Sequence, residues 1–192
     1  AATAYNRGQV LYRLAEMMEA RTGDLAAVCS GKKEVEAAVD RVVWYAGWAD
    51  KLAQVLGSSN PVAGPYFDFT VPEPTGVVAI LAPTEPALGG LVSRLAPALV
   101  GGNAVVAVAS EAHPVAAIEL AEALATSDFP DGTVNILTGL RDELAPWLAG
   151  PGQPVQVEAP LPSTSRSPSR WPPPRAPAWE PPSPPPPGPA PV

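Results

Sequence analysis

The chain has 192 residues and a formal net charge of −7, which suits one domain of ordinary size. Because nucleic-acid binding depends on clustered Lys and Arg, the acidic balance argues against a nucleic-acid partner. The single cysteine, Cys29, excludes an internal disulfide and a cysteine-based zinc cluster. No apolar run approaches the ~20 residues that span a bilayer, so we expect a cytoplasmic protein without a membrane segment. Because Ala1 is not Met and lies within a helical pattern, we expect a piece of a longer protein.

The N-terminal part of the chain has the periodicity of two long helices. Apolar residues recur at spacings of three and four from Gln9 to Val28 and again from about Glu34 to Leu56. Residues 57–65, GSSNPVAGP, have the composition of a loop. YFDFTV (66–71) alternates aromatic with polar residues, which predicts an exposed strand of a β-ribbon with its polar residues on one face.

An alternation of apolar strands and helices follows. The predicted strands are 76–82, 103–109 and 133–139, and the helices that follow them are 88–100, 114–126 and 141–149. Continuous apolar strands separated by helices favour a parallel sheet that is buried on both faces, with right-handed crossovers. We therefore predict an α/β fold: two leading helices and a β-ribbon strand, then an incomplete Rossmann-like parallel sheet of three β-α units.

The C-terminal part of the sequence is rich in proline. Most of the 27 prolines lie from Pro151 onward, and proline lacks the backbone donor that helices and sheets need. We expect a folded domain over 1–150 and a disordered Pro-rich tail over 151–192. The tail should add no strand, which would leave one edge of the half-sheet unpaired. PxxP spacings such as Pro174 to Pro177 allow weak binding to modules that recognise Pro-rich segments.

One stretch of the chain carries a family resemblance. Residues 73–111, EPTGVVAILAPTEPALGGLVSRLAPALVGGNAVVAVASE, resemble without a gap the first half of the cofactor domain of aldehyde dehydrogenases. The family pattern there is roughly E-P-x-G-V-V-x-x-I-x-P-W-N-F-P, then K-L-A-P-A-L-x-x-G-N-x-V-V-x-K-P-S-E. The leading helices and ribbon strand are similar to that family's leading helices and oligomerisation element, and FPDGTVNILTG is similar to its third strand. The resemblance covers about residues 7–145. It implies an NAD-binding fold and a homo- or hetero-oligomer with aldehyde-dehydrogenase-type subunits.

The first departure from the family pattern follows the first parallel strand. The family's Pro-Trp-Asn supplies an amide that stabilises the oxyanion formed when a cysteine attacks the aldehyde, and the aligned residues here are Pro83, Thr84 and Glu85. A carboxylate accepts hydrogen bonds and cannot donate them, so Glu85 would repel the developing charge. Losing one such donor costs about 10²–10³ in rate. Glu85 either caps or faces solvent at a helix N-terminus, or it occludes the former active-site mouth.

The second departure concerns the cofactor. The family's K-P-S-E places Lys and Glu on the hydroxyls of the adenine ribose, and the aligned residues here are Val108 and Glu111. Glu111 remains the best cofactor-binding candidate, because a single carboxylate can still accept from a ribose hydroxyl. Three further residues align with the family's cofactor-binding positions and are expected to be vestigial there: Pro83, Thr84 and Val108. We expect NAD binding to be weak or absent, without a preference for a 2′-phosphate.

The third departure lies beyond Gly139, where the family's general-base Glu and nucleophilic Cys cannot be found. The sequence changes at Gly150 to the Pro-rich tail, as an alternative exon, a premature ending or a shifted reading frame would produce. The chain keeps the rest of the family pattern but lacks its Trp, Asn and Lys. In this combination it is most similar to aldehyde dehydrogenase family 16, whose vertebrate members carry tandem domains and lack the usual catalytic cysteine.

These departures predict a catalytically inactive aldehyde-dehydrogenase-like fragment or isoform that acts through assembly or partner binding. The first alternative is part of an NAD-dependent oxidoreductase that converts aldehydes to carboxylic acids with catalytic residues outside this chain. The second alternative is a Pro-rich adaptor on a truncated scaffold.

Other reactive residues have plain structural interpretations. Cys29 ends an amphipathic helix and is expected to be a half-buried structural thiol. His113 has no second ligand nearby in the sequence, so we expect no metal site. Glu122 and Asp128 belong to a solvated helix surface and a cap region. Three aromatic residues are expected in the core or at an interface: Trp44, Tyr45 and Trp48.

Overall fold

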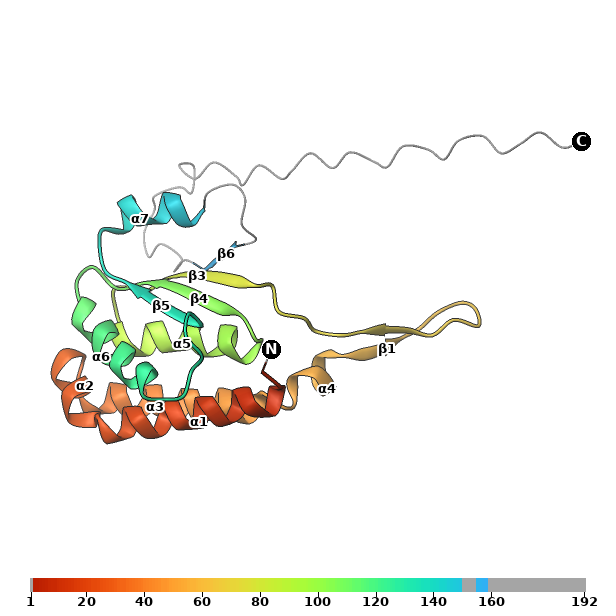
Figure 1. The fold of residues 1–192 in the computed structure, drawn as a ribbon, viewed down its shortest axis with the longest axis horizontal. Helices are drawn as coiled ribbons and strands as arrows, with labels where there is room; N and C mark the ends of the chain where they lie inside the picture. Colours follow the sequence, from red (N-terminus) through yellow and green to blue (C-terminus); the bar gives the residue numbers. More distant parts are fainter. Residues whose placement is uncertain (1, 150–154, 159–192) are drawn as a thin grey trace, which may run out of the picture. The chain divides into compact units, whose positions relative to one another are not determined.

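The computed structural model describes residues 2–149 and 155–158. Its helices are α1 (Ala4–Ala20), α2 (Thr22–Val28), α3 (Lys32–Trp48), α4 (Leu52–Leu56), α5 (Ala87–Val100), α6 (Pro114–Ala125) and α7 (Arg141–Leu148). Its strands are β1 (Ser58–Asn60), β2 (Asp68–Thr70), β3 (Val77–Leu81), β4 (Ala104–Val108), β5 (Val134–Leu137) and β6 (Val155–Glu158). The predicted α/β order of leading helices, ribbon and β-α units is confirmed (Figure 1). The predicted disorder of the Pro-rich tail concerns residues that, apart from 155–158, lie outside the described part.

Each of the two predicted leading helices is divided in the structure. α1 ends at Ala20, since the φ of −100° and ψ of 21° of the next residue, Arg21, leave the helical region, and α2 begins at Thr22. The Thr22 hydroxyl donates to the Glu19 carbonyl at 2.6 Å and so satisfies one of the last acceptors of α1. α3 likewise gives way to the short helix α4. Periodicity alone did not detect these breaks, because the apolar spacing continues across them.

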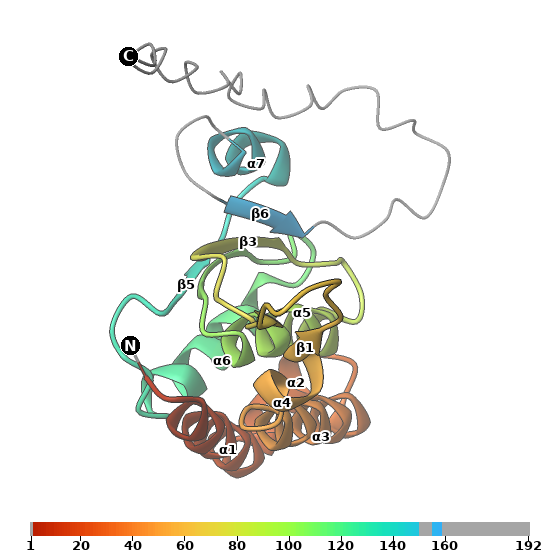
Figure 2. The same cartoon turned by 90° about the vertical axis from the view of Figure 1, so that its right-hand side faces the viewer.

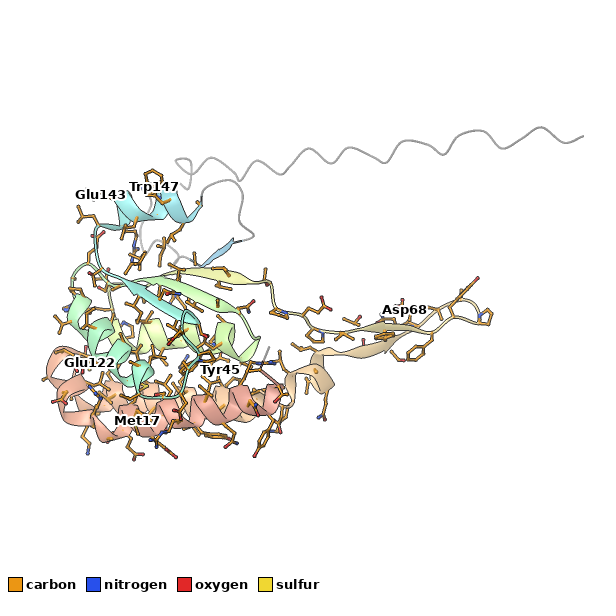
Figure 3. The ribbon with its side chains drawn as sticks, viewed as in Figure 1. Met17, Tyr45, Asp68, Glu122, Glu143 and Trp147 are labelled. Carbon is orange, nitrogen blue, oxygen red and sulfur yellow. The ribbon has the colours of Figure 1, made fainter. Side chains whose placement is uncertain are left out.

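The ribbon is an antiparallel pair in which Ser58 faces Thr70 and Asn60 faces Asp68. The prediction of a loop over 57–65 was wrong for β1, because backbone pairing with β2 overrides its turn-like composition. The Asn60 amide donates to the Asp68 carboxylate at 3.2 Å and to the Thr70 hydroxyl at 3.1 Å, so these polar groups share one face. Figure 3 shows Asp68 on this ribbon, away from the parallel sheet.

The parallel sheet has the strand order β5-β4-β3-β6. α5 and α6 cover one face, with α1 and α3 packed beneath them, and α7 lies on the opposite side (Figures 1 and 2). The main core joins these layers through buried side chains that include Leu14 of α1, Val42 of α3, Ile80 of β3, Leu91 of α5 and Leu120 of α6. The apolar stripes of the leading helices therefore bury against α5 and α6.

β6 corrects the expectation that nothing after residue 150 extends the sheet. Val155 to Glu158 pair in parallel with Val77 to Ile80, so β6 covers the edge of β3 that the sequence left unpaired. Figure 2 shows β6 beside β3. A four-residue strand between proline-containing segments carries little periodic signal, and its pairing depends on a strand far away in the sequence. The boundary at residue 150 between domain and tail stays a prediction.

The Gly-Asn pair between α5 and β4 has a clear physical role. Gly102 has a φ of +85°, a conformation that favours glycine after a helix end. The Asn103 side chain accepts from the Gly76 N–H at 3.0 Å and donates to the Ala98 carbonyl at 3.0 Å. This bridge ties the start of β3 to the end of α5 and aligns the strands in register. Within the described residues, we find no helix that combines the length and apolar character needed to cross a membrane.

Candidate functional site

The predicted site residues meet at the carboxyl edge of the sheet, where β3 and β4 end side by side. Leu81 pairs with Val108, so the loops that follow each strand are neighbours. The Ser110 hydroxyl donates to the Thr84 carbonyl at 3.3 Å and accepts from the His113 N–H at 3.3 Å. Parallel register thus brings Thr84 and Glu111 to one edge, as expected where ligands bind in open α/β sheets.

Glu85 faces solvent at this edge, with its side chain 74% exposed. Its Oε1 lies 3.6 Å from Nε2 of His113, which follows β4. Of the two roles expected for Glu85 at the helix start, capping or facing solvent, the structure has the solvent-exposed one, since Glu34 from α3 binds the amides of Leu88 and Gly89 in α5. A cavity of about 250 Å³ opens beside Glu85 and is also lined by Cys29 and His113. The side chain at position 85 is therefore an exposed carboxylate, which when ionised accepts hydrogen bonds and donates none.

Glu34 is a residue that sequence reasoning missed. Its Oε1 accepts from the N–H groups of Leu88 and Gly89, both at 2.9 Å, and its Oε2 accepts from the Ser30 N–H at 2.8 Å. Burial opposes ionisation, but these amides, Gly89 first, hold the pKa of Glu34 below its ordinary value. No local pattern could have revealed a partner 54 residues away.

Cys29 is partly buried at the end of α2 and close to Glu34. Burial raises the pKa of the Cys29 thiol, and the negative charge of Glu34 raises it further. A raised pKa keeps the thiol protonated and therefore weakly nucleophilic. Across the described ranges 2–149 and 155–158, no three His, Cys, Asp or Glu side chains are grouped so as to hold a metal ion.

The predicted cofactor residues are close together but already engaged. Val108 is fully buried and can offer no cation. Oε1 of Glu111 accepts from the backbone N–H of Arg141, and the Arg141 guanidinium donates to the Ala82 carbonyl. Because one carboxylate oxygen of Glu111 already accepts from the chain itself, a ribose hydroxyl would have to share that oxygen or use the second one. Arg141 could have been noticed in the sequence, since a cation is disfavoured in the first turn of a helix.

The remaining candidates lie away from this edge. Glu122 forms an ion pair with Arg21, which ties α6 to the end of α1, and Asp128 has a φ of +59° after α6. Glu122 is labelled on α6 in Figure 3. The aromatic residues of α3 form one cluster: Trp44, Tyr45 and Trp48. Trp44 is exposed, whereas Tyr45 packs against the core.

The sequence matches the model of the aldehyde dehydrogenase family over residues 1–151. It is 36% identical over 146 residues to retinal dehydrogenase 2 of Gallus gallus, covering 71% of this chain and 28% of that protein. It is 33% identical over 145 residues to omega-crystallin of Enteroctopus dofleini, covering 71% of this chain and 29% of that protein.

Solved structures give the same result. An NAD-dependent aldehyde dehydrogenase from Sinorhizobium meliloti superposes with a TM-score of 0.72 at 26% identity, covering 78% of this chain and 31% of that one. An NAD⁺ complex of an aldehyde dehydrogenase from Bacillus cereus superposes with a TM-score of 0.72 at 25% identity, covering 77% and 32%. The chain therefore spans less than a third of the length of these relatives.

Proposed function

The chain belongs to the aldehyde dehydrogenase family, and on that premise we propose that it is a catalytically inactive member that acts through assembly. The observation that carries the proposal is the exposed aromatic ribbon formed by β1 and β2. The proposed partner is a second copy of this chain or another aldehyde-dehydrogenase-type subunit. Placement in family 16 and a cytoplasmic location stay predictions.

The ribbon has the properties of a surface that pairs with another chain. Phe67 is 78% exposed and Phe69 is 57% exposed, and their ring centroids lie 5.4 Å apart. Tyr66 and Val71 extend this apolar surface and are also exposed. An isolated two-stranded ribbon is marginally stable in water, and its unpaired edges offer backbone donors and acceptors to a partner strand. Pairing with a second subunit would bury the aromatic side chains and complete the backbone hydrogen bonding.

Inactivity is supported by the chemistry at the carboxyl edge of the sheet. Glu85 stands where the family pattern has its oxyanion amide, and a carboxylate there opposes the negative charge of the intermediate. The protonated thiol of Cys29 is a poor substitute nucleophile. We further propose that NAD binds weakly, because Glu111 is engaged by Arg141.

Substituting serine for both Phe67 and Phe69 is expected to weaken self-association of the chain at least tenfold, or about 1.4 kcal/mol, since buried aromatic anchors dominate interfaces. Sedimentation equilibrium of the wild-type and double-variant chains measures the change. Val115→Ser is the matched control, because Val115 is 53% exposed but lies on α6. A monomeric wild type, or equal weakening by the control, would contradict assembly through the ribbon.

A second candidate function is a segment of an NAD-dependent aldehyde oxidoreductase whose catalytic residues lie outside these 192 residues. The small share of each relative that the chain covers favours it. An aldehyde-dependent rise in NADH absorbance from the chain as given would instead refute inactivity. The Pro-rich adaptor stays a prediction, and a peptide of residues 160–192 that binds no SH3, WW or EVH1 domain would count against it.

A further inference from the structure

Arg141 joins the ends of the two central strands at the carboxyl edge of the sheet. Its backbone N–H donates to Oε1 of Glu111, which follows β4. Its guanidinium Nη2 donates to the carbonyl of Ala82, which follows β3. Arg141 therefore donates two hydrogen bonds, one to the loop that follows β4 and one to the end of β3.

Packing of α7 holds Arg141 in this position. Ala145 is buried against Leu81 of β3 and Val108 of β4, and Leu144 and Leu148 pack against the same cluster. Arg141 is the first residue of α7, so the contact with Glu111 also brings a carboxylate to the positive end of the helix. The two hydrogen bonds and the apolar cluster therefore restrain the same helix on the same strands.

We propose that Arg141 fills the adenosine-ribose subsite from within and is the residue that excludes nucleotides from this chain. Ribose hydroxyls bind by donating to acceptors such as the Glu111 carboxylate, and a backbone N–H and a guanidinium N–H are donors of the same kind. The donors of Arg141 belong to the same chain and lose no translational entropy when they bind, whereas a free nucleotide does. The nucleotide therefore competes with them at a disadvantage. The inference deepens the proposal of weak NAD binding by naming its cause.

The alternative role for Arg141 is a cation that attracts a phosphate on the ribose. A guanidinium suits phosphate well, but here the Glu111 carboxylate stands at the same helix start and would repel an anion. The two roles predict opposite effects of removing the Arg141 side chain. If Arg141 occupies the ribose subsite, nucleotides should bind more tightly without it, and if Arg141 binds a phosphate, they should bind more weakly.

Two substitutions separate the donors. Arg141→Ala removes the guanidinium and keeps the backbone N–H, whereas Arg141→Pro removes both. Proline is well tolerated at the first position of a helix. Leu140, with φ of −72° and ψ of 127°, already has the backbone that a following proline requires. Arg13→Ala is the matched control, because Arg13 lies on α1 in an exposed ion pair with Glu16.

Calorimetric titration of the full chain with adenosine 5′-monophosphate, adenosine 2′-monophosphate and NAD tests the proposal. We expect Arg141→Ala to tighten 5′-monophosphate and NAD binding at least tenfold over wild type and Arg141→Pro to tighten it further. The Arg13→Ala chain should bind as wild type does. Adding Glu111→Ala to Arg141→Ala should abolish the gain, because the ribose acceptor is then missing. Circular dichroism verifies folding, and if Arg141→Pro unfolds, the alanine variants decide.

The outcomes separate this inference from the proposed function. Weak binding by wild type and by every Arg141 variant would overturn the filled-subsite inference and leave weak NAD binding standing. Tight binding by wild type, lost in Arg141→Ala and strongest for the 2′-phosphate, would overturn both and identify Arg141 as a phosphate ligand.

Discussion

Replacement of Glu34 by alanine is expected to lower the free energy of unfolding by about 2–3 kcal/mol, because partly buried amides lose a charged acceptor. The amides are those of Leu88 and Gly89 in the first turn of α5, and that of Ser30 before α3. First-turn amides have no partner inside their own helix. Glu34 therefore fastens the leading helices to the helix that follows β3, and its loss should loosen both.

The contribution of Glu34 should depend on pH in a defined direction. The pKa of Glu34 is lowered in the folded chain from an ordinary value of 4.5, so the unfolded chain binds more protons through that range. The stabilisation is then fully present above pH 4.5 and is lost as the pH falls through the folded pKa. The stability difference between wild type and Glu34→Gln should accordingly be largest near neutral pH and shrink below pH 4.5.

Urea unfolding at neutral and acidic pH, followed by tryptophan fluorescence, measures both effects. Glu36→Ala is the matched control, because Glu36 lies on the same helix and forms only an exposed pair with Lys32 at 3.5 Å. Its loss should cost less than about 1 kcal/mol. Equal costs for Glu34→Ala and Glu36→Ala would show that the three-amide contact contributes no special stability.

The parts of the fold that could be predicted from the sequence are the helices and strands whose own residues show a hydrophobic periodicity. Each strand-helix unit carries its own change of periodicity, from a continuous apolar run to spacings of three and four. The place of Thr84, Glu85 and Glu111 at one edge was also predictable, because parallel strands in register end together. Local pattern and parallel geometry therefore located the candidate site.

The parts that could not be predicted depend on partners far apart in the sequence. Glu34 binds amides 54 and 55 residues away, and Arg141 reaches Ala82 across 59 residues. The pairing of Glu85 with His113 likewise arises only when the loops after β3 and β4 meet. The partners of such side chains become visible only when the fold brings distant segments together.

β6 also depends on a partner far away in the sequence, because it pairs with β3. Removing β6 therefore tests how much this pairing contributes to the stability of the fold. Deleting Val155–Glu158 is expected to lower the free energy of unfolding by roughly 2–4 kcal/mol, because several ladder hydrogen bonds worth about 1 kcal/mol each are lost. For a domain of this size that corresponds to a melting temperature lower by roughly 5–15 °C. The exposed edge of β3 should also promote aggregation, which light scattering during thermal unfolding detects.

A pair of proline substitutions makes the β6 test specific to backbone pairing. Among the described strands, β6 pairs with β3 alone, so successive residues of β6 point their N–H groups alternately toward β3 and away from it. Of Gln156→Pro and Val157→Pro, only one should remove a ladder hydrogen bond and approach the deletion in its effect, while the other should melt closer to wild type. If both variants and the deletion melted as wild type does, the pairing of β6 with β3 would contribute nothing to the stability of the sheet, and the edge of β3 would need no cover.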